Sequence, residues 1–230
     1  MPYRKEQFVN GEYYHIINRG IDGRNIFLNR ADYERFLEGI EKFNTAQPVC
    51  IQTLRKSVGR PASNQVGSRA SNHPLVEIIC YCLLPNHFHL LLKQIRDGGI
   101  QKFLQKFLTG YTKYFNLKNE RRGHLFQDVF RAVPILEESH FSHISRYIYL
   151  NALDLFEPSW REGQIKDWNK CKKFLENYPW SSYPSFKNNF SSESSSNIFK
   201  ENFRTAEDYE NFLREWAGRE KENVELFLES

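Results

Sequence analysis

Two histidines one residue apart, His87 and His89, stand at the start of an apolar run and are the residues of this chain best suited to chemistry. The run follows a Pro-Asn turn signal, and its composition is typical of a β-strand. Because strand side chains alternate between faces, both imidazoles point the same way, about 7 Å apart, close enough to bind one metal ion. Phe88 and Leu90 then face a core. The pattern predicts a metal-assisted reaction.

A helix expected to begin at Glu137 offers two more polar groups, Tyr147 and Asn151, which lie four residues apart and therefore share a helix face. A tyrosine beside a metal ion is a plausible nucleophile. An amide oxygen one turn away could ligate the same ion, and oxygen ligands suit Mg²⁺ or Mn²⁺ better than Zn²⁺. Spacing alone favours a packing role for Tyr147. Tyr111, on another apolar helix, is a rival nucleophile for which packing is also favoured.

The surrounding pattern is strand, helix, strand, strand, helix, strand, helix. The expected strands are 13–18, 76–83, 87–94 and 130–136, and the expected helices are 32–43, 100–117 and 137–153. Apolar residues on both faces of 76–83 indicate a central strand, while Pro134 favours an edge position for the last strand. This order predicts an α+β fold, an antiparallel sheet with helices packed mainly on one face, plus a C-terminal helical extension.

Composition limits the classes of protein that this chain can be. With 230 residues, 40% of them hydrophobic, it can form a real core, and no apolar run approaches the ~20 residues that span a bilayer. We expect one domain over 1–186, with 45–75 as a flexible insertion, followed by a linker and a C-terminal helix over 187–230. The first residues lack the apolar core of a signal peptide, so a cytoplasmic protein is expected. A net charge of +4 permits a nucleic-acid partner without requiring one.

Six segments, taken in order, resemble one protein family. They are YHIINRG (14–20), PNHFHLL (85–91), YTKYFN (111–116), GHLFQ (123–127), RYIYLN (146–151) and YPWSSY (178–183). The second resembles the His-hydrophobic-His signature of the HUH single-strand nucleases. Together the six resemble the single-tyrosine transposases of small insertion sequences, especially their REP-associated branch. The chain departs from that family after Asn151, where Ala-Leu-Asp stands in place of the Asn-Pro that often continues such helices.

The resemblance implies a ferredoxin-like HUH nuclease core and a metal-dependent transposase that cuts single-stranded DNA. His87, His89 and Asn151 would bind Mg²⁺ or Mn²⁺. Tyr147 would attack phosphorus, giving a 5′-phosphotyrosine and a free 3′-hydroxyl, and a second 3′-hydroxyl would reverse the step and transfer the strand. The histidines must be neutral to bind metal, so cleavage is expected to fail in mild acid.

The implied substrate is hairpin, REP-like DNA, and the implied assembly is a monomer or a homodimer, with the monomer favoured. Two alternatives stay open: a domesticated hairpin-DNA-binding protein that no longer cuts, and a metal hydrolase that does not need Tyr147. His15 and Gln127 are candidate accessory residues, with structural roles as the alternative. Basic side chains that could contact DNA phosphates, or simply be solvated, are Arg19, Lys113, Arg121, Arg122 and Arg131.

Overall fold

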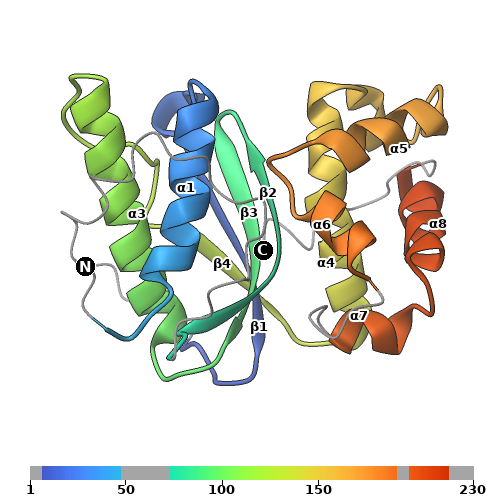
Figure 1. Ribbon diagram of the computed structural model, residues 1–230, viewed down its shortest axis with the longest axis horizontal. Helices are drawn as coiled ribbons and strands as arrows, with labels where there is room; N and C mark the ends of the chain where they lie inside the picture. The colour runs from blue at the N-terminus through green and yellow to red at the C-terminus, as the bar shows by residue number, and fades with distance from the viewer. Residues whose placement is uncertain (1–6, 48–72, 191–196, 218–230) are drawn as a thin grey trace.

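The computed structural model describes residues 7–47, 73–190 and 197–217, and a four-stranded antiparallel sheet lies at the centre of this part of the chain (Figure 1). The strands are β1 (Tyr13–Arg19), β2 (Val76–Leu84), β3 (His87–Gln94) and β4 (Arg131–Ile135), in the order β2-β3-β1-β4. In sequence, α1 (Arg30–Phe43) lies between β1 and β2, and α3 (Gly99–Lys118) lies between β3 and β4. This is the ferredoxin-like arrangement, and the expected α+β fold is confirmed.

The turn between β2 and β3 is as short as the sequence predicts. Pro85 and Asn86 separate the two strands, and β3 pairs with β1 so that His89 lies opposite Ile17. The alternation along β3 places Phe88 and Leu90 in the core beneath α1 and α3. The two histidines face the other side of the sheet, as expected.

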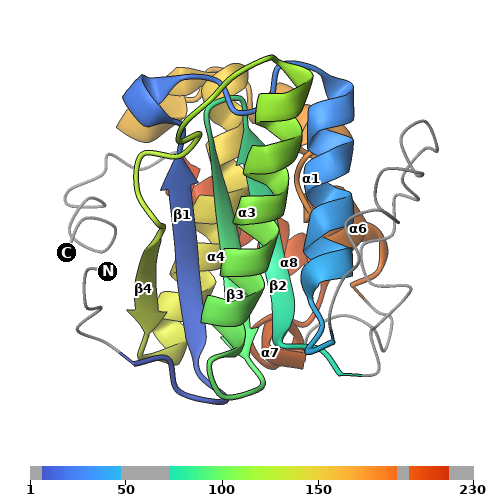
Figure 2. The ribbon, with the colours of Figure 1, turned by 90° about the vertical axis from the view of Figure 1, so that its left-hand side faces the viewer.

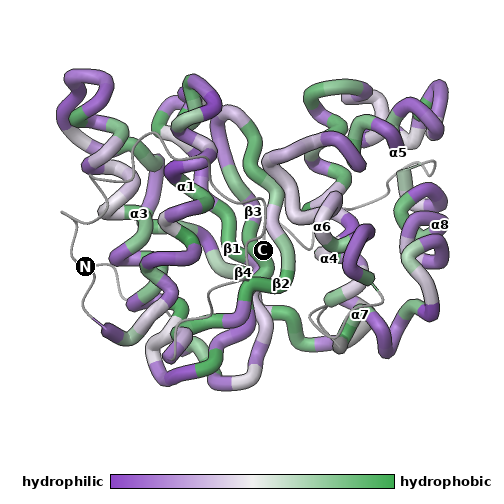
Figure 3. The backbone as a smooth tube through the Cα atoms, in the orientation of Figure 1, coloured by the Kyte–Doolittle hydropathy of each residue, from purple (hydrophilic) through white to green (hydrophobic). Residues whose placement is uncertain are grey.

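Helices cover both faces of the sheet, which corrects the expectation that they pack mainly on one. α1 and α3 cover the first face (Figure 2), whereas α4 (Glu138–Leu150) and the helices after it cover the second (Figure 1). The physical reason is that the second face is also apolar at positions such as Cys80 and Leu91, which are completely buried. The hydrophobic strands accordingly lie between two layers (Figure 3).

The α1–α3 pair packs at close range because glycines lie at the contact. A Cβ atom on Gly39 would lie 2.9 Å from the Phe107 ring, and one on Gly110 would lie 2.7 Å from the Phe43 ring. Both separations are shorter than carbon atoms tolerate, so only glycine permits this approach. The first layer is therefore held tightly against the sheet face that carries Phe88.

The strand β2 lies at an edge of the sheet and not at its centre, which corrects the interpretation of its apolar pattern. The YPWSSY segment covers that edge: the Leu83 N–H donates to the Trp180 carbonyl at 2.9 Å, and the Ser182 N–H donates to the Tyr81 carbonyl at 3.0 Å. Covering the edge buries both faces of β2, so the sequence pattern resembles that of a central strand. The edge position expected for Pro134 in β4 is confirmed.

The region after α4 contains more helix than the sequence suggested. Its elements are η2 (Asn151–Leu155), η3 (Pro158–Glu162), α5 (Trp168–Asn177), α6 (Tyr183–Asn188), α7 (Asn197–Asn202) and α8 (Ala206–Ala217). The expected boundary after residue 186 falls inside α6, and residues on both sides of it share one core with α4. Most of the expected insertion at 45–75 lies outside the described residues. No helix in the described part of the chain is long and apolar enough to cross a membrane.

α8 holds α4 in place against the sheet. The Ser145 hydroxyl hydrogen-bonds to that of Tyr209 at 2.9 Å. The Arg146 guanidinium lies 4.1 Å from the Phe212 ring centroid and 3.8 Å from that of Trp216. Cation–π contacts of this kind are stabilising when the cation is shielded from water, and the Arg146 side chain is buried. The residue that follows, Tyr147, is therefore presented from a fixed helix.

Candidate active site

Three imidazoles meet on the sheet face beneath α4. His15 from β1 is completely buried, and His89 and His87 from β3 are 3% and 9% exposed. The ring centroids of His87 and His89 are 5.0 Å apart, and those of His15 and His89 are 5.1 Å apart. The structure thus brings the two predicted metal ligands together and adds His15 beside them.

Hydrogen bonds set which nitrogen of each ring is available. The Nδ1 of His87 lies 2.6 Å from the Asn86 Oδ1, an acceptor, so that ring donates from Nδ1 and keeps its lone pair on Nε2. The Nδ1 of His89 lies 3.0 Å from the Nε2 of His15. Within the described residues, the buried Nε2 of His89 has no hydrogen-bond partner.

Burial keeps all three rings neutral. It lowers the pKa of His15 to about 3, with a smaller contribution from the positive charge of Arg131. Burial also lowers the pKa of His87 to about 4, aided by Arg19, and it holds the pKa of His89 well below its usual range. Neutral imidazoles carry the lone pairs that metal binding requires.

The predicted nucleophile, Tyr147, projects from α4 onto this cluster. Its half-buried ring lies 5.6 Å from the His89 ring and 6.2 Å from the His15 ring, edge to face in both cases. The sheet and α4 come from distant parts of the sequence, so this meeting depends on the complete fold. Tyr111 lies in the core on the other side of the sheet, where its hydroxyl donates to the Ile26 carbonyl.

Asn151 lies one turn beyond Tyr147 and is completely buried. Its Nδ2 donates to the Tyr147 carbonyl at 2.6 Å, and its Oδ1 accepts a hydrogen bond from the Nη2 of Arg161 at 2.8 Å. Both polar atoms of the amide are therefore engaged within the protein. In this arrangement Asn151 links the main chain of Tyr147 to Arg161.

Arg161, on η3, is a residue that the sequence reasoning missed. It donates from Nε and Nη2 to the two carboxylate oxygens of Asp154, at 2.8 and 2.6 Å, and Trp160 Nε1 donates to the same carboxylate at 2.8 Å. Its guanidinium lies 5.8 Å from the Tyr147 ring centroid. No signal in one sequence assigns Arg161 to the site, because only the turn between η2 and η3 brings it back to α4.

The two histidines of β3 fit a divalent cation better than the amide does. His89 offers a buried nitrogen with no described partner, and the bond from Asn86 leaves His87 Nε2 with its lone pair. Both rings are oriented through their second nitrogen, as metal-binding imidazoles usually are. The Asn151 oxygen is already occupied. Among the described residues, no three His, Cys, Asp or Glu side chains form a metal cluster, so two protein imidazoles are the donor set that fits.

The other predicted residues divide between the two sides of the sheet. Arg19 pairs in register with His87, the Gln127 N–H donates to the Arg19 carbonyl at 2.9 Å, and the charge of Arg131 acts on His15. These three therefore lie near the histidine face. Lys113 lies exposed on α3, in the opposite layer. Arg121, in the loop after α3, donates to the Asn116 side chain, and Arg122 is exposed in the same loop.

With this geometry established, comparison with known proteins is informative. Residues 51–151 match the protein family described as "Transposase IS200 like". This stretch, which is less than half of the chain, is similar to that family. The expected resemblance to the transposases of small insertion sequences is confirmed, and the matched stretch includes both histidines of β3, Tyr147 and Asn151.

Solved structures give two further similarities. One is a structure of a REP-associated tyrosine transposase bound to a REP hairpin, which is 17% identical over 80% of this chain and 84% of that chain, with a TM-score of 0.49. The other is tRNA(His) guanylyltransferase from Saccharomyces cerevisiae, 12% identical over 98% of this chain and 86% of that one, with a TM-score of 0.37. Among curated proteins no match is found. The similarity to the transposase family rests on the matched stretch alone.

Proposed function

We propose that this protein is a metal-dependent endonuclease and strand transferase for single-stranded DNA, with Tyr147 as its nucleophile. The observation that carries the proposal is the position of the Tyr147 ring, 5.6 Å from the ring of His89 and on the same sheet face as His87. The phenol ring that projects from α4 thus lies beside neutral imidazoles that are oriented for metal binding. Such a site suits attack on a phosphodiester better than it suits a purely structural role.

In the proposed cleavage step, the Tyr147 Oη forms a bond to phosphorus and the bond from phosphorus to the 3′-oxygen breaks. The products are a 5′-phosphotyrosine and a DNA 3′-hydroxyl. In the transfer step another 3′-hydroxyl attacks phosphorus and the phenolic oxygen leaves. Each step exchanges one phosphoester bond for another, so strand exchange needs no external energy source.

His87 and His89 would hold the divalent cation, Mg²⁺ or Mn²⁺. When bound, such an ion polarises the scissile phosphate and offsets charge on its oxygens. Asn151 is the proposed third ligand, a role that requires its oxygen to exchange the Arg161 guanidinium for the ion. Arg19 and Arg131 lie close enough to this face to contact the DNA backbone near the reacting phosphate.

We propose hairpin DNA of the REP type as the substrate, because the neighbour that was solved with DNA is described as bound to a REP hairpin. The test uses end-labelled hairpin DNA with a single-stranded flank, incubated with the protein and Mn²⁺ and then denatured. Label that stays on the protein, mapped by peptide sequencing to Tyr147, supports the proposal. A gel shift without an adduct would indicate a non-cleaving binder, and cleavage without an adduct would indicate a hydrolase.

The hydrogen bond between His15 and His89 leads to a prediction about metal affinity. A lone pair on His89 Nε2 requires the hydrogen of that ring on Nδ1, where it donates to His15 Nε2. Replacing this partner, His15→Ala, is expected to weaken Mn²⁺ binding about 10- to 100-fold, the usual loss when a partner of a ligand is removed. Calorimetric titration measures the affinity, with the exposed His124→Ala as the control. Equal affinities in both variants would contradict the role of His15.

A further inference from the structure

Among the described residues, Arg161 is the cationic side chain that lies over the ring of Tyr147, the proposed nucleophile. Its guanidinium contacts the Tyr147 ring at 5.8 Å and the Trp160 ring at 4.8 Å. Burial alone would lower the pKa of Arg161, but its hydrogen bonds to the Asp154 carboxylate and the nearby Tyr147 side chain raise it. The guanidinium is therefore a close neighbour of the phenol that is proposed to react.

The position of Arg161 is fixed independently of Tyr147. Asp154 accepts two hydrogen bonds from it, in the bidentate geometry that makes Arg–carboxylate pairs specific. Asp154 is itself held by the Trp160 Nε1, and the Trp160 side chain is completely buried in the core beneath α4. The guanidinium is therefore preorganised, and it would stay beside Tyr147 even after Asn151 released it.

The guanidinium of Arg161 has N–H groups that its observed hydrogen bonds do not use. Nε and Nη2 serve Asp154 and Asn151, which together use three of the five N–H groups. The two hydrogens of Nη1 remain for the phenolic oxygen and for a phosphate oxygen bonded to it. A lysine ammonium has three donors at one point and cannot meet all these acceptors from the same position.

We propose that Arg161 is a catalytic residue that orients the Tyr147 hydroxyl and stabilises the negative charge that develops on its oxygen. This inference rests on the proposed function, and it adds a second cationic group beside the phenol. In cleavage the phenolic oxygen bonds to phosphorus and its proton passes to water. In transfer that bond breaks, and Arg161 receives the departing phenolate.

The test is single-turnover adduct formation on labelled hairpin DNA with Mn²⁺. Arg161→Ala is expected to lower the rate about 10²- to 10³-fold, the loss typical for removal of one donor to a developing oxyanion, while the Kd for DNA changes little. Arg161→Lys is expected to be intermediate. Millimolar guanidinium chloride is expected to restore part of the rate to Arg161→Ala and to leave the wild-type rate unchanged, which a merely structural role would not produce.

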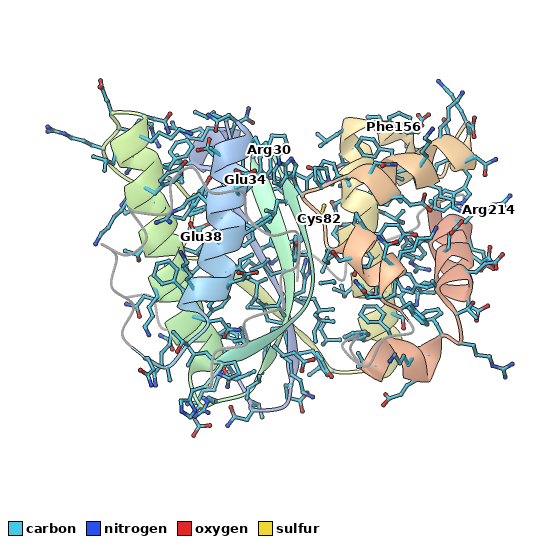
Figure 4. All side chains as sticks on the ribbon, in the orientation of Figure 1. Arg30, Glu34, Glu38, Cys82, Phe156 and Arg214 are labelled. Carbon is cyan, nitrogen blue, oxygen red and sulfur yellow. The ribbon has the colours of Figure 1, made fainter. Side chains whose placement is uncertain are left out.

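Controls separate this inference from the proposed function. Arg214→Ala removes an exposed arginine on the outer side of α8, far from the site (Figure 4), and is expected to keep the wild-type rate. Arg161→Gln keeps a donor for Asn151 and gives the same comparison if Arg161→Ala does not fold. A wild-type adduct with unchanged Arg161 variants, or a rate loss matched by lost DNA binding, overturns the role of Arg161 alone. The absence of an adduct in the wild type overturns the proposed function, and this inference with it.

Discussion

Tyr147→Phe is expected to abolish the covalent protein–DNA adduct and to lower strand cleavage on the order of 10⁴-fold or more, as loss of a nucleophile does in other covalent enzymes. The variant removes one oxygen and keeps the ring, so the edge-to-face contacts with His89 and His15 remain. Because the ring carries most of the packing, we expect the free energy of unfolding to change by less than about 1 kcal/mol. Denaturing gels of labelled DNA measure the adduct, and gel shifts measure binding, which should persist.

The matched control is Tyr149→Phe, two residues further along α4. Its completely buried ring packs against Tyr183 and Tyr209 and faces away from the histidines. Tyr149→Phe should retain the adduct at close to the wild-type rate. A second control, Tyr111→Phe, examines the rival nucleophile. An adduct that survives in Tyr147→Phe and disappears in Tyr111→Phe would show that the nucleophile has been misassigned.

The part of the site that could be predicted from sequence lies on regular elements with strong local patterns. The alternation around His87 and His89 fixed their common face, because the period of a strand is two whatever surrounds it. The four-residue spacing of Tyr147 and Asn151 fixed their common helix face in the same way. Spacing did not predict that the two pairs of residues lie close together. Only the resemblance to a family indicated that α4 packs near β3.

The part that could not be predicted depends on contacts between irregular segments. The edge position of β2 was missed because the covering strand-like segment lies about a hundred residues later, at Trp180 to Ser182. Arg161 was missed because it lies in the second of two short 3₁₀ helices, whose path no sequence periodicity predicts. Phe156 lies in this irregular region between α4 and α5 (Figure 4). The sequence pattern within one element carries no information about where an irregular segment folds back onto an earlier part of the chain.

Acid is expected to destabilise this protein steeply, because three histidines are buried in neutral form. The folded-state pKa values of His15 and His87 are lowered to about 3 and 4, and that of His89 lies well below its usual range. An unfolded histidine has a pKa of about 6.5, so the unfolded chain takes up protons first as the pH falls. This contribution to stability is full above pH 6.5 and is lost progressively between about pH 6.5 and 4.

The expected size of this loss is about 2–3 kcal/mol for each of His15 and His87 at a pH of about 4.5, or roughly 4–6 kcal/mol for the two, and the lowered pKa of His89 adds to it in the same direction. That is comparable with the whole stability of a typical domain, about 5–15 kcal/mol. Urea unfolding measured between neutral pH and pH 4.5 would test it. His15→Gln removes one titrating group and should reduce the slope by about 1.4 kcal/mol per pH unit, whereas the exposed His124→Gln should leave it unchanged. Equal slopes for His15→Gln and the wild type would contradict this account.

The same burial changes the expected pH dependence of cleavage. From sequence, protonation of the two β3 histidines predicted a loss of activity in mild acid. With the pKa of His87 lowered to about 4 and that of His89 held well below its usual range, both imidazoles stay neutral in mild acid as long as the fold persists. Adduct formation should therefore survive mild acid and fail together with the folded state, so the two pH profiles should coincide. Activity lost near pH 6 in a protein that is still fully folded would mean that the histidines titrate as exposed groups, and the buried arrangement of the site would then be wrong.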